Sequence, residues 1–354
     1  MKEKIITFTY IGYILIFSLL HIIIPDNEIS STERRKLAKL PQIELTNEYI
    51  TKIDKYLTDN FPYRNTFRSI KAKFNYNILN KKDNNKIYLK DNYIFKSNYP
   101  TNTKSINNFI TKSNKLLNNL NPNNNIYLMI IPDKNYYLND NNFIHIDYNY
   151  IYQELENLNL TTIDIRNILE LSDYYETDTH WKQERLVKIV KHMSNTMKFN
   201  YYNYNYQYNT YNNFYGVYYG ESAINRDPET LTYLTNNILD NVTVKYLENN
   251  NLTSIYNIDN LTSLDSYEVY LDGASSYIEI TNPFNATNRE LVIFRDSFAS
   301  SVTPLLVPYY KKITLIDNRY ISSDNYLDLI EFTNQDIILM YSTLIINDSS
   351  TLKG

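Results

Sequence analysis

The chain has 354 residues and a formal net charge of −4, which suits one large or two smaller domains and gives no basic face for nucleic acid. It contains no Cys, which excludes disulfides, thiolate metal sites and a Cys nucleophile. Its 5 Gly are not grouped as the Rossmann and P-loop patterns require, so we expect no nucleotide cofactor.

The N-terminus carries an apolar run from Ile5 to Ile24, which Pro25 ends. This is the roughly 20 residues needed to cross a bilayer, so we predict a transmembrane anchor over residues 1–25. A cleaved signal peptide is the alternative, although no small-x-small cleavage site follows the run. Lys2 and Lys4 favour a cytoplasmic N-terminus. We therefore expect a single-pass protein of the cell membrane whose main domain is extracytoplasmic.

Residues 26–95 are predicted to form a juxtamembrane helical lead-in. Within it, Ile50, Ile53 and Leu57 recur at helical spacing before a break at Phe61 and Pro62. We expect this segment to pack on the main domain.

Residues 96–354 are predicted to form the main α/β domain. Short apolar runs typical of buried parallel strands occur at Ile126–Ile131, Thr162–Ile165, Leu291–Phe294, Ile313–Ile316 and Ile337–Met340. Helical patterns lie at Asn102–Leu120, Tyr148–Leu158, Lys182–Met197, Phe298–Tyr310 and Ser323–Phe332. This alternation predicts three layers around a central parallel sheet.

A region at about 199–289 interrupts that alternation. It has little helical pattern and contains β-like pieces at Val242–Tyr246, Tyr267–Leu271 and Tyr277–Ile280. We predict a β-rich insertion near the site, or a cap over it.

Ser297 follows the apolar run that ends at Phe294 and precedes a helical pattern. Ligands gather beyond the carboxyl ends of strands in open α/β sheets, so a nucleophile fits this position. We expect free backbone N–H groups at the start of the next helix to face the same place and to suit a developing oxyanion. A helix cap is the alternative explanation for Ser297.

Asp178 and His180 are two residues apart directly before Trp181. In an extended loop this spacing allows both side chains to lie on one side, where the carboxylate orients the imidazole. The alternatives are a surface His and an Asp that caps the next helix. We expect no metal site, because zinc needs three or four ligands and one His with one carboxylate is too few.

Several separate motifs resemble the DHHW protein family and, more distantly, the AlgX and AlgJ alginate O-acetylation proteins. The family's Asp-x-His-Trp motif corresponds to Asp178, His180 and Trp181, with Thr179 where many relatives carry a second His. The Lys- or Arg-Asp-Ser-Phe motif corresponds to Arg295 through Phe298. Weaker likenesses lie at Asp59–Arg64, Ile131–Lys134 and Ile316–Tyr320, which extend the resemblance over Ser30 to Tyr341.

The resemblance implies an SGNH-hydrolase-like fold and a Ser-His-Asp site outside the membrane. Ser297 would be the nucleophile, His180 the general base and Asp178 the residue that orients it. Lys134 and Trp181 are predicted to bind substrate, although an ordinary solvated lysine is equally consistent with the position of Lys134.

The function that we expect is acyl, chiefly acetyl, transfer to a cell-surface polysaccharide. A membrane-bound acyltransferase would supply the acyl group. Two alternatives remain open: a carbohydrate esterase, in which water is the acceptor, and a non-catalytic glycan-binding or assembly protein, in which Tyr rings stack on sugars.

Overall fold

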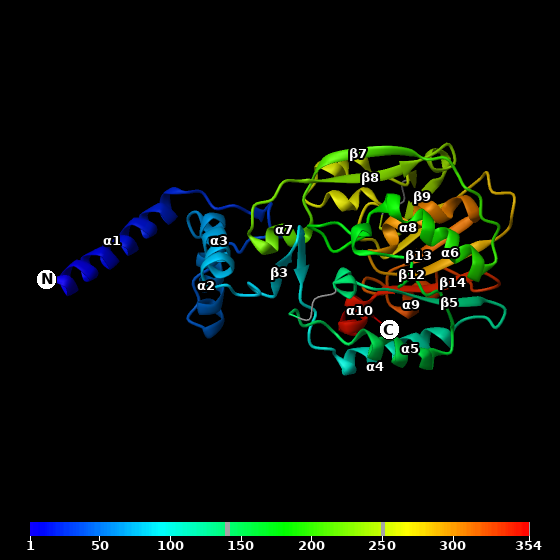
Figure 1. The fold of residues 1–354 in the computed structure, drawn as a ribbon, viewed down its shortest axis with the longest axis horizontal. Helices are drawn as coiled ribbons and strands as arrows, with labels where there is room; N and C mark the ends of the chain where they lie inside the picture. The colour runs from blue at the N-terminus through cyan, green and yellow to red at the C-terminus, as the bar shows by residue number, and fades with distance from the viewer. Residues whose placement is uncertain (139–141, 249–251, 354) are drawn as a thin grey trace. The chain divides into compact units, whose positions relative to one another are not determined.

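A computed structural model describes residues 1–138, 142–248 and 252–353 (Figure 1). The chain forms two compact units. The first contains residues 1–87 and 217–227, and the second contains residues 88–216 and 228–354.

The first unit is mostly helical. It contains α1 (Lys2–Ile23), the short strands β1 (Ile29–Ser30) and β2 (Arg35–Lys36), then α2 (Asn47–Asp59), α3 (Arg64–Lys73) and α7 (Val217–Ser222). Thr46 starts α2 by accepting a hydrogen bond from the backbone N–H of Tyr49 (3.1 Å). The predicted break at Phe61 and Pro62 lies between α2 and α3, and a π-helical turn, Phe74–Ile78, continues α3.

The second unit is built on an eight-stranded sheet in the order β10-β9-β11-β13-β12-β14-β5-β6. Its parallel part contains β13 (Lys312–Ile316), β12 (Glu290–Arg295), β14 (Asp336–Ser342), β5 (Asn125–Ile131) and β6 (Thr161–Thr162). Four of them coincide with predicted runs, and β6 overlaps the predicted run Thr162–Ile165 only at Thr162. The antiparallel part contains β11 (Tyr277–Thr281), β9 (Thr243–Tyr246) and β10 (Leu252–Thr253).

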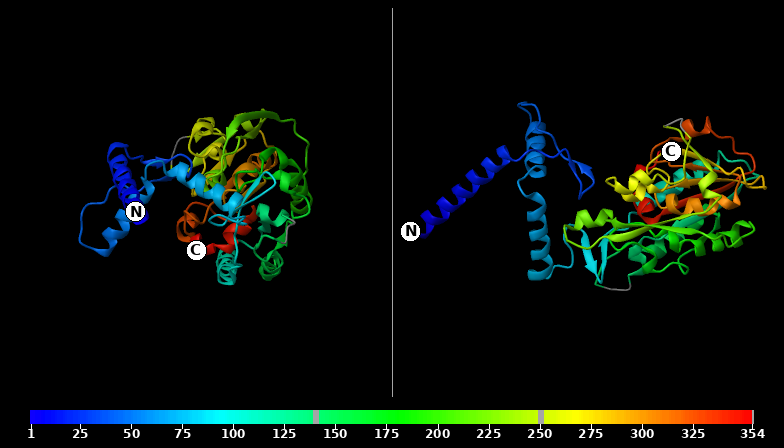
Figure 2. Two further views of the ribbon diagram at one scale, coloured as in Figure 1. Left: turned by 60° about the vertical axis from the view of Figure 1, so that its left-hand side comes forward. Right: turned by 90° about the horizontal axis from the view of Figure 1, so that it is seen from above.

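Helices cover both faces of this sheet, as Figures 1 and 2 show. On one face lie α4 (Thr103–Leu117), α5 (Tyr148–Leu155), α9 (Ser323–Leu327) and α10 (Thr343–Asn347), and on the other lie α6 (Val187–Met197) and α8 (Ala299–Leu306). Successive strand residues alternate between the two cores: Leu128 and Phe294 face α4, whereas Met129 and Ile293 face α8. The predicted three-layer α/β architecture is confirmed.

The region at about 199–289 differs in detail from its prediction. It contributes β9, β10 and β11 to the sheet edge and also forms a hairpin of β7 (Gln207–Phe214) and β8 (Glu229–Thr235). The predicted strand at Tyr267–Leu271 is wrong, because Ser266–Val269 is a 3₁₀ turn. The Asp265 carboxylate accepts the N–H of Tyr267 and starts this turn, which is a local bond that competes with strand pairing.

A further hairpin, β3 (Ile87–Lys90) with β4 (Tyr93–Lys96), lies where the chain passes into the second unit. Its core is formed by Tyr88 and Phe95, whose rings stack at 5.2 Å between centroids. The helical lead-in predicted for residues 26–95 therefore also contains strand.

Candidate functional site

Acidic residues follow four of the five parallel strands at their carboxyl ends. They are Asp133 after β5, Asp164 after β6, Asp296 after β12 and Asp317 after β13. Asp164 and Asp317 each form a pair of hydrogen bonds with an arginine two residues further on. Asp296 instead accepts the N–H of Ser342 at the end of the neighbouring strand β14, and Asp133 accepts the hydroxyl of Thr343, the next residue.

Residues 295–300 form the Ser297 turn, which connects β12 to α8. The buried Asp296 carboxylate accepts the N–H of Phe298 (3.0 Å) and the N–H of Ser342 (2.7 Å). Behind it, the buried Arg295 donates to Ser300 Oγ (2.7 Å). The turn is thereby fixed from both ends, and Ser297 is its half-buried residue.

Free N–H groups at the start of α8 were expected to face Ser297. Three of them are already engaged: Phe298 N–H with the Asp296 side chain, Ala299 N–H with the Asp296 carbonyl and Ser300 N–H with the Ser297 carbonyl. That expectation is wrong for these three groups, because the turn satisfies its own donors.

His180 lies beside Ser297, although the two are 117 residues apart in the chain. His180 Nε2 is 2.8 Å from Ser297 Oγ, and its Nδ1 is 2.6 Å from Asp178 Oδ1. Asp178 Oδ1 also accepts the backbone N–H of His180 (3.0 Å). Because a carboxylate only accepts hydrogen bonds, Nδ1 carries the proton and Nε2 is left to accept the Ser297 hydroxyl.

The imidazole of His180 is held against Tyr267. The two rings are stacked with centroids 3.9 Å apart and planes 7° from parallel. The Tyr267 hydroxyl donates to Ser301 Oγ on α8 (2.8 Å). Tyr267 therefore fixes the plane of the imidazole relative to the helix that follows Ser297.

Trp181 is fully buried beneath the site. Its indole N–H is shared between the Phe298 carbonyl (3.0 Å) and Ser301 Oγ (2.9 Å). These bonds connect the residue after His180 to the residue after Ser297. The burial of Trp181 argues for this positioning part rather than for the predicted contact with substrate.

Residues 173–182 form the His180 loop, a tight turn whose two ends pair through Tyr174 and Trp181. Glu229 on β8 binds the tip of the His180 loop. One of its carboxylate oxygens accepts the N–H of Glu176 (2.7 Å), and the other accepts the N–H of Thr177 (2.7 Å). Gly216 packs against the same tip and donates to Thr177 Oγ1 (2.9 Å). A Cβ on Gly216 would lie 2.2 Å from Thr177 backbone atoms, so only glycine fits.

Lys134 supports the loop from the other side. Its side chain is buried, and its Nζ donates to the carbonyls of Tyr175 and Glu176 (3.0 Å each). Burial lowers the pKa of Lys134 to about 7, against the opposing effect of nearby carboxylates that include Glu229 and Asp178. This position makes Lys134 a support for the residues just before Asp178, rather than the solvated lysine of the sequence alternative.

Three contributors were not found from the sequence: Tyr267, Glu229 and Gly216. Tyr267 and Glu229 carry no local signal among many similar residues. Gly216 is one of only 5 glycines in the chain. This scarcity is the one sequence signal that could have indicated a close approach of two backbone segments at Gly216.

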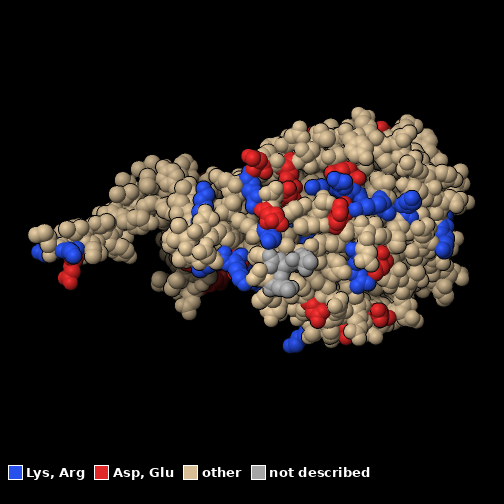
Figure 3. Space-filling model, in the orientation of Figure 1, with Lys and Arg blue, Asp and Glu red and all other residues tan. Residues whose placement is uncertain are grey.

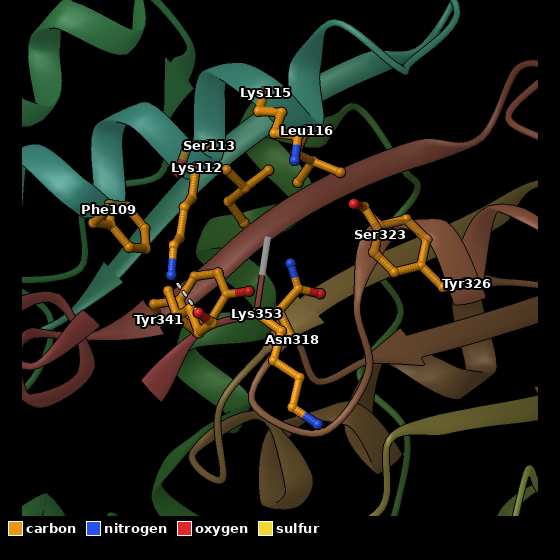
Figure 4. Close-up of a pocket in the computed structure, with 12 residues that line it drawn as sticks. Phe109, Lys112, Ser113, Lys115, Leu116, Asn318, Ser323, Tyr326, Tyr341 and Lys353 are labelled. Atoms are coloured by element: carbon orange, nitrogen blue, oxygen red, sulfur yellow. Dashed lines mark hydrogen bonds between the residues drawn. The ribbon is translucent and has the colours of Figure 1, made fainter. Parts of the chain in front are cut away.

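A small hollow lies elsewhere, on the α4 face of the sheet (Figure 4). It is lined by Phe109, Leu116, Tyr326 and Tyr341 and encloses about 20 Å³, room for about one water. None of Asp178, His180 and Ser297 lines it. Among the described residues there is also no group of three His, Asp or Glu side chains arranged to hold a metal ion.

No protein-family model matches the chain, and no curated protein matches it. Solved structures do. A DHHW family protein from Eubacterium siraeum superposes with a TM-score of 0.64 at 18% identity, covering 77% of this chain and 97% of that one. PatB1 from Bacillus cereus, in a structure with a sulfonyl adduct, superposes with a TM-score of 0.57 at 18% identity, covering 76% and 96%.

The O-acetyltransferase domain of AlgJ from Pseudomonas putida is a more distant match, with a TM-score of 0.43 at 10% identity, covering 74% of this chain and 92% of that one. The relation to the DHHW family that the sequence motifs suggested fits the match to the DHHW family protein. At such identities, the likeness to the DHHW family protein and to PatB1 establishes the fold, which is SGNH-hydrolase-like.

Proposed function

We propose that this protein transfers acyl groups, chiefly acetyl, to a cell-surface polysaccharide through Ser297, His180 and Asp178. The observation that carries the proposal is a pair of hydrogen bonds made by the two ring nitrogens of His180, one to Asp178 and the other to Ser297 Oγ. In such an arrangement the base is adjacent to the nucleophile and is itself oriented by a third group.

In the first half-reaction, Ser297 Oγ attacks the carbonyl carbon of an acyl donor. The hydroxyl proton passes to His180 Nε2, which lies 2.8 Å away, and Asp178 stabilises the imidazolium that forms. The donor's leaving group then takes this proton and departs. Ser297 is left as an acyl ester, and His180 is neutral again.

In the second half-reaction, a sugar hydroxyl replaces the leaving group. His180 Nε2 accepts the proton of the hydroxyl as its oxygen attacks the Ser297 ester, and returns that proton to Ser297 Oγ as the serine departs. The polysaccharide gains an O-acyl group, and the free Ser297 hydroxyl is restored.

The proposed donor is a membrane-bound acyltransferase, and the proposed location is the outer face of the cell membrane. Support comes from α1, whose 22 residues are long and apolar enough to cross a bilayer. Figure 3 shows charged side chains on this helix only near its N-terminal end. A single anchor of this kind would keep the site close to a donor in the same membrane.

The test uses the full chain in detergent micelles. Incubation with an activated acetyl ester should add one acetyl group, detected by intact mass and assigned to Ser297 by peptide mapping. We expect Ser297→Ala to remove the adduct and His180→Ala to slow its formation by at least about 10³-fold. Equal labelling of wild type and Ser297→Ala would contradict the proposal.

The acceptor is tested separately, because an esterase shares the first half-reaction. Preformed acetyl-enzyme is mixed with surface polysaccharide or with buffer alone. Faster loss of the adduct with polysaccharide, together with acetylated product, supports transfer. Acetate release at the same rate with every polysaccharide would identify an esterase instead.

A further inference from the structure

Helix α3 and the π-helical turn after it carry an exposed apolar stripe. We call Phe67, Ile70, Phe74 and Ile78 the α3 stripe; these residues are 40%, 56%, 50% and 65% exposed. The spacings of three and four residues place all four on one face of the helix. Four large apolar side chains in a row are more than the scattered single residues normal for a protein surface.

The opposite face of the helix is the one that packs on the first unit. Ala72 is fully buried, and Asn75 is buried in a hydrogen bond with Asn84 (2.8 Å). Arg68 donates to the carbonyl of Gly220 on α7 (2.9 Å). The core of the unit is thus packed by the other side of α3. Within the stripe, Phe67 makes ring contacts with Phe61 and with Phe17 of α1, each at 5.7 Å between centroids.

The position of the stripe follows from contacts with α1. The ring of Phe17 on α1 is stacked on Phe61 (5.2 Å between centroids) and lies against Phe67 (5.7 Å). Nearby, the rings of His21 and Tyr56 are in edge contact at 5.4 Å. The corner between α2 and α3 is therefore packed on the outer part of α1.

The contacts with α1 indicate how deep the start of the stripe lies in the membrane. Phe17 lies six residues before the end of α1 at Ile23, which is about 9 Å along a helix axis. The 22 residues of α1 are about the length that a hydrocarbon core of about 30 Å requires. With α1 across the membrane, Phe17 lies below the outer boundary of the hydrocarbon, and Phe67, the first residue of the stripe, touches it there.

The charges around the stripe fit a lipid surface. Lys71 and Lys73 lie in the last turn of α3, and Lys81 and Lys82 follow the π-helical turn. A helix with an apolar face bordered by lysines is typical of segments that lie in the plane of a bilayer. Anionic headgroups attract such side chains.

We propose that α3 and its π-helical turn lie in the outer interface of the membrane, with the α3 stripe among the lipid chains and the lysines among the headgroups. The occupant of the stripe is the bilayer itself. The proposal depends on α1 as a membrane anchor and is independent of the acyl chemistry. It gives the first unit a second membrane contact.

The test exploits the absence of Cys from the chain. Ile70→Cys and a matched control on the same helix, Asn65→Cys, are labelled with the same environment-sensitive fluorophore. Asn65 is exposed and lines a hollow with Arg68 and Gly220, on the side away from the stripe. Each full-length protein is reconstituted into vesicles of phosphatidylcholine with phosphatidylglycerol, and quenching is measured with doxyl lipids and with iodide.

We expect lipid-borne quencher to reduce the Ile70 signal at least threefold more than the Asn65 signal, and iodide to show the reverse order. Ile78→Cys should behave like Ile70→Cys, which guards against a local effect of one substitution. Equal iodide quenching at positions 65, 70 and 78 would overturn the proposal and leave water over the stripe.

Discussion

The Ser297 turn and the His180 loop meet at the proposed triad, but different contacts hold them. In the Ser297 turn, Asp296 and Arg295 bond mainly to nearby residues and to the neighbouring strand β14, with one longer bond of 3.4 Å from Arg295 to the Ser275 carbonyl. In the His180 loop, the supports come from distant elements: Lys134 after β5 and Glu229 on β8. The Ser297 turn is thus held chiefly by the sheet, whereas the His180 loop is held by side chains from other elements.

This difference indicates where the site is vulnerable. Strand ends are fixed by the sheet ladder, so the Ser297 turn keeps its shape as long as the core is intact. The His180 loop depends on a few buried polar contacts, each of which is costly to leave unpaired. Substitutions remote from the chemistry should therefore act through the loop, and four changes test this in order of expected effect.

Asp178→Asn should have the largest effect. The amide favours the wrong tautomer of His180 and cannot stabilise its charged form, so we expect acylation of Ser297 to slow by about 10⁴-fold. The measurement is the time course of the acetyl adduct by intact mass. The matched control is Asp164→Asn, a strand-end aspartate paired with Arg166, and it should stay within about threefold of wild type.

Glu229→Gln comes next. Its carboxylate accepts three hydrogen bonds from the loop tip, and the amide replaces one accepting oxygen with a donor. A displaced loop should slow acylation by about 10²-fold, as small misplacements of reacting groups do. Glu156→Gln, at an exposed position, is the control. If both variants kept the wild-type rate, the loop would not depend on its distant supports.

Lys134 should make stability depend on pH. Its pKa of about 7 in the folded state lies below its usual value of 10.5, so between these values the unfolded chain binds more protons. Unfolding free energy should therefore rise from pH 7 to 9, by roughly 2 kcal/mol from this group. Urea melts of wild type and Lys134→Met check it. The rise should be smaller in Lys134→Met, and parallel pH curves would contradict the assignment.

Tyr267 should have the smallest effect, and a graded one. Removing the ring in Tyr267→Leu should slow acylation by about fivefold, because an aromatic pair contributes about 1 kcal/mol. Tyr267→Phe keeps the ring against His180 and should lose less than about threefold. Tyr267→Phe is the control for general destabilisation, because it keeps the ring packing and loses only the hydrogen bond to Ser301.

Much of the fold could be predicted from local pattern. The five parallel strands are short apolar runs, and their alternating residues fill two separate cores, so their number and type follow from periodicity. The β7 and β8 hairpin was missed because β7 lies in Asn- and Tyr-rich sequence without a clear alternation, which left β8 without a recognised partner strand. The 3₁₀ turn at Ser266–Val269 was predicted as a strand because its apolar residues are typical of a strand, and the capping role of Asp265 was not recognised.

For the site, the sequence by itself placed Ser297 after a strand and set Asp178 and His180 two residues apart on one loop, because both features depend on neighbours in the chain. Only the tertiary structure decided that His180 lies 2.8 Å from Ser297, that Tyr267 stacks on its ring, and that Lys134 and Trp181 are buried supports. These contacts join residues far apart in the sequence, and they are fixed by how the packed layers fit together, which no local periodicity encodes.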